Sequence, residues 1–191
     1  APSANTSGRV SPTTADHVQA DLGARIGLIL DGGPAGVGVE STILKVEGSA
    51  IRLLRPGGLA VETIEGRIGR PVIRPDTAGA AIEAPGMLAS HYAPKAPVRL
   101  DATDMRPGEI LINFGGQAVA GIETAVAAFD LSPGGSLREA AANLFAIMKK
   151  ADRLPAHGIA FAPVPRHDLG EAINDRIARA AAPRPETSDA T

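Results

Sequence analysis

The feature that most limits how this chain can fold is a stretch rich in proline and glycine over residues 75–97. Proline lacks a backbone N–H and both residue types disfavour regular structure, so no helix or strand can run through this stretch. It carries His91 and Tyr92, the chain's only tyrosine, which indicates that it packs against something. We therefore predict a linker that separates residues 1–74 from residues 98–182. The interrupting residues are Pro75, Gly79, Pro85, Gly86, Pro94 and Pro97.

After the linker, short apolar runs alternate with segments of helical periodicity. Ser136 and Glu139 have the spacing of a capping box ahead of one helix, and Asp168 and Glu171 have it ahead of another. Alternating strands and helices predict a small, Rossmann-like α/β domain over 98–182, with a parallel or mostly parallel sheet. The expected strands are Val98–Leu100, Glu109–Phe114, Val126–Leu131 and Gly158–Ala162.

Before the linker, the residues predict a helix, a hairpin and a second helix. Ser11 has the side chain of a helix N-cap, Pro12 suits the first helical position, and Gly23 would end this helix. Two β-rich runs joined through Glu47, Gly48 and Ser49 are typical of a hairpin. The expected elements are the strands Val39–Val46 and Ile51–Leu54 and a short helix over Val61–Arg67.

Composition narrows the possible function classes. The chain has 44% apolar but only 3% aromatic residues, so its core must be mainly aliphatic. A net charge of −2 disfavours tight nucleic-acid binding, although a local basic patch remains possible. With no cysteine, disulfides and thiolate metal sites are excluded, which is compatible with the cytoplasmic location that we expect. No apolar run reaches the roughly 18–20 residues of a membrane helix. The polar residues 183–191 are expected to form a disordered tail.

The chain opens with a loop of small residues, from Ala1 to Gly8. Hydroxyl groups at Ser3, Thr6 and Ser7 could contact phosphate oxygens just ahead of a helix N-terminus, whose partial positive charge favours anions. A capped loop without a ligand explains the same residues. Because no strand precedes the loop to hold it, we expect the chain to be the C-terminal part of a larger protein.

Three further segments could contact a ligand, and each also has an ordinary structural explanation. The glycines of 36–42 could let the backbone approach a ligand, or they could form a turn into a strand. Arg55, at a strand end, could bind phosphate or carboxylate, or face water. His91 could carry a proton, and Tyr92 could stack at a domain junction. No carboxylate or second histidine lies near His91 at metal-ligand spacing, so no metal held by side chains is expected.

Several short motifs follow one another along the chain. They are Ala1–Asn5, Ser11–Thr14, Asp31–Gly33, Gly38–Ile43, Leu54–Gly57, Pro85–Met87 with His91–Pro94, and Leu169–Arg176. In this order they resemble the YrdC-like family of threonylcarbamoyl-adenylate synthases, in its longer, two-domain form, over essentially the whole chain. The resemblance implies that 1–74 is the C-terminal part of a YrdC-like α/β catalytic domain. It implies that 98–182 is the accessory domain.

What this family implies is the conversion of L-threonine, bicarbonate and ATP into threonylcarbamoyl-AMP and pyrophosphate, with Mg²⁺ accompanying the nucleotide. The product supplies downstream enzymes that modify adenosine next to the tRNA anticodon. Such chemistry depends on positioning the reactants and on stabilising phosphate charge. A linker that folds back over the site would shield a labile carbamate from water. By resemblance, Ser3 and Asn5 belong to the catalytic motif, Ser3, Ser11, Arg55 and Tyr92 contact ATP, and Ala1 and Ser41 contact threonine.

One departure from the family pattern is large. The family's Lys-x-Arg pair and much of its threonine pocket have no counterpart in these residues. We therefore expect the chain alone to synthesise the adenylate inefficiently, and its first unit to expose strand edges and apolar surface.

Three alternatives remain open. The first is a related carbamoyl-transfer domain, although the linker and the following α/β domain argue against it. The second is a non-catalytic RNA-binding module. The third is that 98–182 form only a regulatory or interaction domain. The local positive charge available to an RNA-binding module comes from Arg52, Arg55, Arg67, Arg70 and Arg74.

Overall fold

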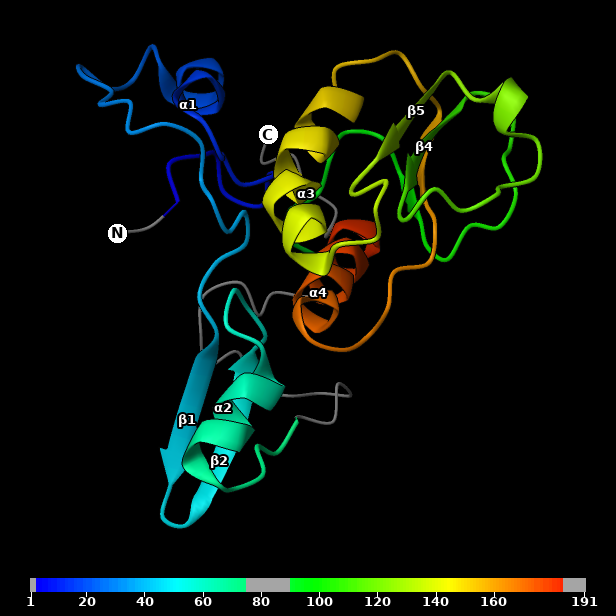
Figure 1. The fold of residues 1–191 in the computed structure, drawn as a ribbon. Helices are drawn as coiled ribbons and strands as arrows, with labels where there is room; N and C mark the ends of the chain where they lie inside the picture. The colour runs from blue at the N-terminus through cyan, green and yellow to red at the C-terminus, as the bar shows by residue number, and fades with distance from the viewer. Residues whose placement is uncertain (1–2, 75–89, 184–191) are drawn as a thin grey trace.

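The computed structural model describes residues 3–74 and 90–183 (Figure 1). Helices α3 and α4 lie between the sheet and the N-terminal segment, and a hairpin with one helix extends away from them (Figure 1). Ala1, the motif Pro85–Met87, most of the predicted linker and nearly all of the predicted tail lie outside the described residues. The helices are α1 (Ala15–Leu22), α2 (Val61–Ile68), the 3-10 turn η1 (Ile122–Thr124), α3 (Leu137–Ala151) and α4 (Leu169–Ala181). The strands are β1 (Ile43–Glu47), β2 (Ala50–Arg55), β3 (Val98–Arg99), β4 (Glu109–Asn113), β5 (Ala127–Asp130) and β6 (Gly158–Phe161).

A parallel four-stranded sheet in the order β3-β6-β4-β5 forms the centre of the second unit. Successive side chains of a strand point to opposite faces. Ile110 and Ile112 of β4 accordingly belong to the main core with α3 and α4. Leu111, between them, belongs to a smaller cluster with Ala102 and Met105 on the other face. The predicted α/β architecture with a parallel sheet is confirmed for this unit.

Helix α3 begins with half of the predicted capping box. The Ser136 hydroxyl accepts a hydrogen bond from the Glu139 backbone N–H at 3.3 Å. The Glu139 carboxylate does not return to Ser136, because it accepts a hydrogen bond from the Ser132 hydroxyl. The Ser136 N–H instead donates to the Ser132 oxygen at 2.9 Å. The predicted helix start is therefore correct. The expected bond from the Ser136 N–H to Glu139 is replaced by a bond to Ser132, in the loop before the helix.

The capping box predicted for α4 is wrong. Asp168 occupies the N-cap position with φ 48°, but its side chain makes no capping hydrogen bond. Its carboxylate lies 3.3 Å from the His167 ring instead. Glu171 accepts two hydrogen bonds from the Arg74 guanidinium, at 2.9 and 3.2 Å. The Glu171 carboxylate, which local spacing predicts to cap α4, thus forms an ion pair between the two units instead.

The hairpin of the first unit is antiparallel, and its strands meet at a short turn through Gly48. Leu53, Val61 and Val72 form a small core of its own beneath α2. The predicted first strand starts too early, because pairing begins at Ile43. A Cβ on Gly38 would lie 2.1 Å from the Ala141 carbonyl oxygen, so the residues before β1 pack tightly on α3.

Helix α1 begins later than predicted. Its N-cap is Thr14, whose hydroxyl accepts from the His17 backbone N–H at 3.3 Å, and Gly23 ends it as expected. Ser11 is not a cap, because its hydroxyl donates to the Glu40 carboxylate at 2.9 Å. The Ser11 side chain, which local spacing predicts to cap α1, is therefore bound to the Glu40 carboxylate of a distant segment instead.

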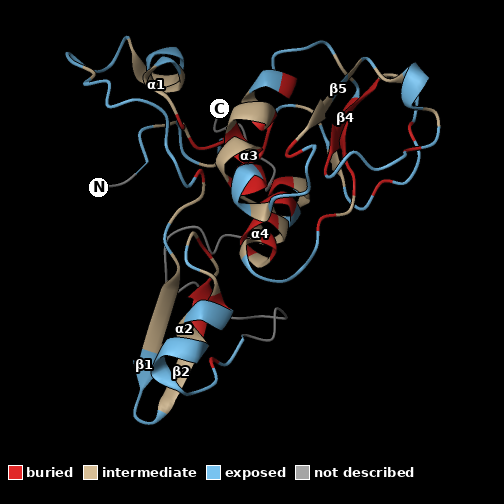
Figure 2. Ribbon diagram, in the orientation of Figure 1, coloured by how far each residue is buried: buried red, intermediate tan, exposed pale blue. Residues whose placement is uncertain are grey.

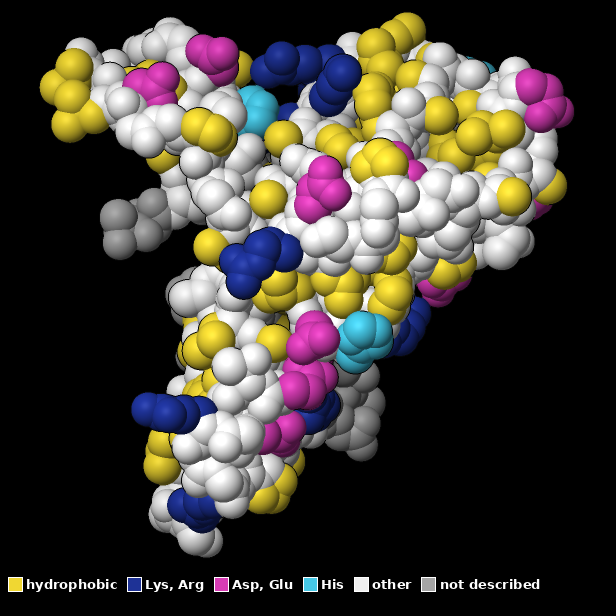
Figure 3. Space-filling view, viewed as in Figure 1, with side chains coloured by type: hydrophobic (Ala, Val, Ile, Leu, Met, Phe, Trp, Pro, Cys, Tyr) yellow, Lys and Arg dark blue, Asp and Glu magenta, His cyan; other side chains and the backbone are white. Residues whose placement is uncertain are grey.

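The segment after α1 forms no strand and exposes apolar side chains. Leu28 is 75% exposed and Leu30 is 86% exposed. Ile26 and Val37 are also exposed, and Figure 3 shows hydrophobic side chains at the outer end of this region. The first unit thus has the exposed apolar surface that we expected.

The first and second units share one core. Val10, from the N-terminal segment, and Tyr92 are buried in the same hydrophobic cluster as α3 and α4. Figure 2 shows that burial is concentrated around these helices and the sheet. Residues 90–97, here called the junction segment, are tied to the N-terminal loop, since the Ala93 N–H donates to the Gly8 carbonyl at 3.0 Å. The N-terminal loop is therefore held by the second unit.

Candidate functional site

The N-terminal loop and the segment before β1 together enclose a cavity of about 290 Å³. Its lining includes Ser3, Ser11 and residues 36–40. Phe145 of α3 contributes to the wall, so the second unit completes the cavity. Hydroxyl groups and glycine backbone in an open cavity suit a polar ligand that needs close approach of the main chain.

Asn5 shapes the N-terminal loop beside this cavity. Its side-chain amide donates to the carbonyls of Thr6 and Arg9, at 3.0 and 3.1 Å. Its Oδ1 atom is buried and accepts no hydrogen bond from the described residues. Buried polar oxygens are normally paired, so this atom has acceptor capacity to offer a ligand.

Glu40 connects the cavity to α4. Its Oε1 accepts the Ser11 hydroxyl at 2.9 Å, and its Oε2 accepts Nε of Arg176 at 2.9 Å. Burial alone would raise the pKa of Glu40, but the Arg176 charge and the hydrogen bonds lower it overall. The carboxylate is therefore held ionised, and the Ser11 proton points toward it. The Ser11 oxygen keeps its lone pairs for a ligand that donates.

The junction segment places His91 and Tyr92 beside this network. Tyr92 is 1% exposed, stacks on Phe145 with ring centroids 5.2 Å apart, and has the Arg176 guanidinium 5.3 Å from its ring centre. Its φ of 59° is in the left-handed region, which is uncommon for an aromatic residue. Burial raises the pKa of Tyr92, and the Arg176 charge opposes that rise. Burial lowers the pKa of His91, against the Glu40 charge.

Arg55 and Ser41 form a separate contact at the end of β2. An Nη of Arg55 donates to the Ser41 backbone carbonyl at 2.9 Å, and Arg55 is only 6% exposed. The Arg55 charge adds to the burial that lowers the pKa of His91, and it opposes the rise in the pKa of Tyr92 that burial causes. The Ser41 residue itself is exposed. Gly57 packs against the backbone of residues 40–42, so the end of β2 and the Glu40 segment are held together.

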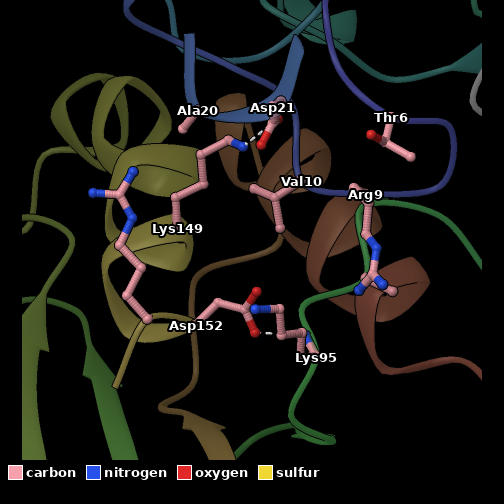
Figure 4. A pocket seen from close by; sticks show the side chains of 10 residues that line it. Thr6, Arg9, Val10, Ala20, Asp21, Lys95, Lys149 and Asp152 are labelled. Atoms are coloured by element: carbon pink, nitrogen blue, oxygen red, sulfur yellow. Dashed lines mark hydrogen bonds and ion pairs between the residues drawn. The ribbon is translucent and has the colours of Figure 1, made fainter. Parts of the chain in front are cut away.

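A second cavity, of about 380 Å³, lies between the N-terminal segment, α1, the junction segment and the C-terminal end of α3 (Figure 4). Lys149 pairs there with Asp21 at 2.7 Å, and the Asp152 carboxylate accepts the Lys95 backbone N–H. Cations at a helix C-terminus offset the negative end of the helix dipole, which accounts for basic residues at this place. The positions of Lys149 and Arg153 are therefore explained by the end of α3 without a ligand.

Comparison with known proteins identifies the family. Residues 59–182 match the family model described as threonylcarbamoyl-AMP synthase, C-terminal domain. Residues 1–57 match the Sua5/YciO/YrdC model, described as telomere recombination. The chain belongs to the Sua5 family of threonylcarbamoyl-AMP synthases. The sequence resemblance to the two-domain, YrdC-like form is thereby confirmed.

Relatives and solved structures agree with this membership. The chain is 37% identical to the threonylcarbamoyl-AMP synthase of Pyrococcus abyssi, over 94% of this chain and 56% of that protein. It is 36% identical to that of Bacillus subtilis, over 96% of this chain and 57% of that protein. The crystal structure of P. abyssi Sua5 with L-threonine superposes with a TM-score of 0.80 at 34% identity, covering 94% of this chain and 56% of that chain. A His/Tyr double alanine variant of P. abyssi Sua5 gives 0.78 at 33% identity.

The chain spans about half the length of the curated Sua5 relatives that it matches. Of the site residues predicted from the sequence, Ser3 and Ser11 share one cavity. Arg55 and Ser41 contact each other, and Tyr92 lies between α3 and α4. These groups are linked through Glu40, Arg176 and the backbone at Gly57, but they do not line a single cavity. Ala1 lies outside the described residues.

Sequence reasoning missed the roles of Glu40 and Arg176. Both lie within motifs that resemble the Sua5 family, yet neither was assigned a contact. They are 136 positions apart, and Arg176 is wholly buried, which is rare for arginine. An arginine on an otherwise amphipathic helix reads as a solvent-facing residue, so no local signal could have found this pair.

Two findings apply to the described part of the chain alone. Residues 3–74 and 90–183 contain no group of three or more His, Cys, Asp or Glu side chains that could hold a metal ion. No helix within these ranges has the length and apolarity needed to cross a bilayer.

Proposed function

We propose that this chain forms part of the active site of a threonylcarbamoyl-AMP synthase, which converts L-threonine, bicarbonate and ATP into threonylcarbamoyl-AMP and pyrophosphate. One observation carries the proposal: both halves of the chain match the family in order, and the chain superposes on threonine-bound P. abyssi Sua5 with a TM-score of 0.80. The product would serve downstream tRNA-modification enzymes in the cytoplasm.

The residue roles that we propose are those that the family resemblance implies. Ser3 and Ser11 would contact ATP from the wall of the 290 Å³ cavity, with Asn5 keeping the Ser3 loop in shape. Arg55, near the junction segment, would stabilise phosphate charge. Tyr92, which stacks on Phe145 of the cavity wall, would contact ATP, and Ala1 and Ser41 would contact threonine.

The chemistry proposed for these side chains is positioning and charge stabilisation. Hydroxyl groups, backbone amides and a buried guanidinium can orient the carbamate oxygen toward the α-phosphorus and stabilise the charge on the departing pyrophosphate. Mg²⁺ would arrive bound to the phosphates of ATP, since this ion keeps few protein ligands at nucleotide sites. Glu40, which contributes a carboxylate to the lining of the cavity, is already paired with Arg176.

The accessory unit is proposed to be Rossmann-like. Its parallel strands are joined by crossovers, and β5 leads through α3 to β6 on the far side of β4. Helices α3 and α4 pack in the cluster on one face, and the cluster on the other face includes the loop residues Ala102, Met105 and Val119.

The enzyme proposal is tested with the 191-residue chain by ATP binding and by pyrophosphate release in the presence of threonine and bicarbonate. We expect saturable MgATP binding that weakens in Ser3→Ala and Arg55→Ala, with little turnover. Absence of MgATP binding by the folded chain would refute these roles for Ser3 and Arg55. Ordinary turnover by this chain alone would refute the expectation that it needs the family's Lys-x-Arg segment.

The RNA-binding alternative gains no support from the structure. Arg52 pairs with Glu47 at 3.2 Å, and Arg74 pairs with Glu171 at 2.9 Å. These contacts neutralise part of the positive charge on which that alternative depends. Salt-dependent tRNA binding without nucleotide binding would favour it over the enzyme.

A further inference from the structure

Arg176 is the most completely buried charged side chain at the contact between the two units. It lies in α4, has 0% exposure, and its guanidinium contacts three different chain segments. Nε donates to Glu40, Nη2 donates to the Pro56 carbonyl at 2.9 Å, and Nη1 donates to the adjacent Asp175. A further face of the guanidinium lies over the Tyr92 ring.

Stability alone does not explain such a group. A buried ion pair can often be replaced by apolar side chains of similar volume with no loss of stability, because removing charges from water is unfavourable. The rigid fork of arginine, by contrast, sets the positions of several acceptors at once. The main effect of Arg176 is therefore to fix the positions of the groups that it contacts.

The atoms that Arg176 positions lead directly to the cavity. It holds one oxygen of Glu40, whose other oxygen accepts the Ser11 hydroxyl. Ser11 lines the cavity that we assign to ATP. The Pro56 carbonyl lies next to Gly57, which packs on the backbone of residues 40–42, so Arg176 holds the Glu40 segment from two sides.

We propose that Arg176 is a positioning residue for the nucleotide site, acting through Glu40 on Ser11, so that α4 of the accessory unit sets the geometry of the catalytic cavity. This inference rests on the proposed function in assigning ATP to that cavity. The accessory unit is then more than a cover, because an arginine from its last helix orients a side chain of the site. Arg176 itself touches no substrate in this scheme.

The test compares Arg176→Met and Arg176→Lys with Arg179→Met, which removes the same charge one turn further along α4. All variants are first checked for folding by circular dichroism and urea unfolding. MgATP affinity is measured by calorimetry for each variant, for Ser11→Ala, and for Ser11→Ala combined with Arg176→Met. The pKa of the Glu40 carboxyl is measured by carbon-13 NMR. The titratable or polar groups around this carboxyl are Ser11, Arg176, His91 and Tyr92.

We expect Arg176→Met to weaken MgATP binding about tenfold, the loss of one hydrogen bond to a charged group. Ser11→Ala should weaken it similarly, and the double variant should bind no more than about twofold more weakly than either single variant. Arg176→Lys should be intermediate, because it keeps the charge and loses the fork. The Glu40 pKa should rise in Arg176→Met and stay unchanged in Arg179→Met.

Additive losses in the double variant, an unchanged Glu40 pKa in Arg176→Met, or an equal loss of affinity in Arg179→Met would each overturn the inference. If Arg176→Met does not fold, Arg176→Lys replaces it in the affinity measurements, alone and combined with Ser11→Ala, and additive losses there would overturn the inference in the same way. If the wild-type chain binds no MgATP, the proposed function fails by itself. The Glu40 titration then decides separately whether Arg176 controls that carboxylate.

Discussion

Gly38 offers the sharpest test of how the two units pack. It has φ 77°, in the left-handed region, and a Cβ there would lie 2.1 Å from the Ala141 oxygen and 2.4 Å from the Ala142 Cα. Both atoms belong to the backbone of α3, which cannot move aside as the end of a flexible side chain could. Gly38→Ala should therefore suffer two penalties, one from its own backbone and one from the helix that it touches.

The size of each penalty can be worked out. A non-glycine residue in the left-handed region costs about 1–2 kcal/mol, and overpacking a dense contact costs about 1–3 kcal/mol. Alanine also restricts the unfolded chain, which offsets about 0.4–1 kcal/mol. The free energy of unfolding should thus fall by about 1–5 kcal/mol, a large share of the roughly 5–15 kcal/mol of a typical domain.

Two nearby glycines separate these penalties. Gly33 has φ 85° with nothing within 4 Å of a Cβ, so Gly33→Ala carries the backbone penalty alone. Gly36 also has open space and no left-handed φ, so Gly36→Ala should be neutral or slightly stabilising. Urea unfolding of the three variants, at unchanged m value, gives the order of their free energies of unfolding. If Gly38→Ala is no less stable than Gly33→Ala, the close packing of this segment on α3 is not formed in solution.

Three other perturbations test the rest of the fold. Burial and the charges of Lys149 and Arg153 lower the pKa of His17 below its ordinary 6.5, so its contribution to stability is present above that value and is lost as pH falls below it. His17→Gln should reduce the drop in the urea midpoint between about pH 7.5 and about pH 5.5, and an undiminished drop would contradict this. The Asn174 amide donates to the carbonyls of Val164, Pro165 and Gly170 at 3.1, 3.1 and 2.8 Å, so Asn174→Ala should lower the free energy of unfolding by about 1–3 kcal/mol. Asn143→Ala, which removes a bond to the Leu131 carbonyl, is the control and should cost less; equal losses would argue against the triple contact. Arg99 donates to Glu109 at 2.9 and 2.6 Å, and Arg99→Met should lower thermal stability by about 1–3 kcal/mol at neutral pH, whereas an unchanged melting temperature would show that the pair contributes nothing.

Local signals predicted most of the regular structure. Helix α2, the hairpin, the start of α3 and the end of α1 at Gly23 lie close to where spacing and capping residues put them. Each depends on neighbours a few residues apart, which a sequence displays directly. The errors occur where a distant partner competes, since Glu40 takes Ser11 from α1 and Arg74 takes Glu171 from α4.

The candidate site divides in the same way. The motifs identify the family and bring Ser3, Asn5 and Arg55 to attention, because residue types and their order are properties of the chain itself. The pairing of Glu40 with Arg176 was decided only by the tertiary structure, since it joins side chains 136 positions apart across two units. The packing of Gly38 on α3 was decided there too. Local sequence determines which backbone conformations are favoured, whereas burial and long-range charge pairing arise only when separate segments come together.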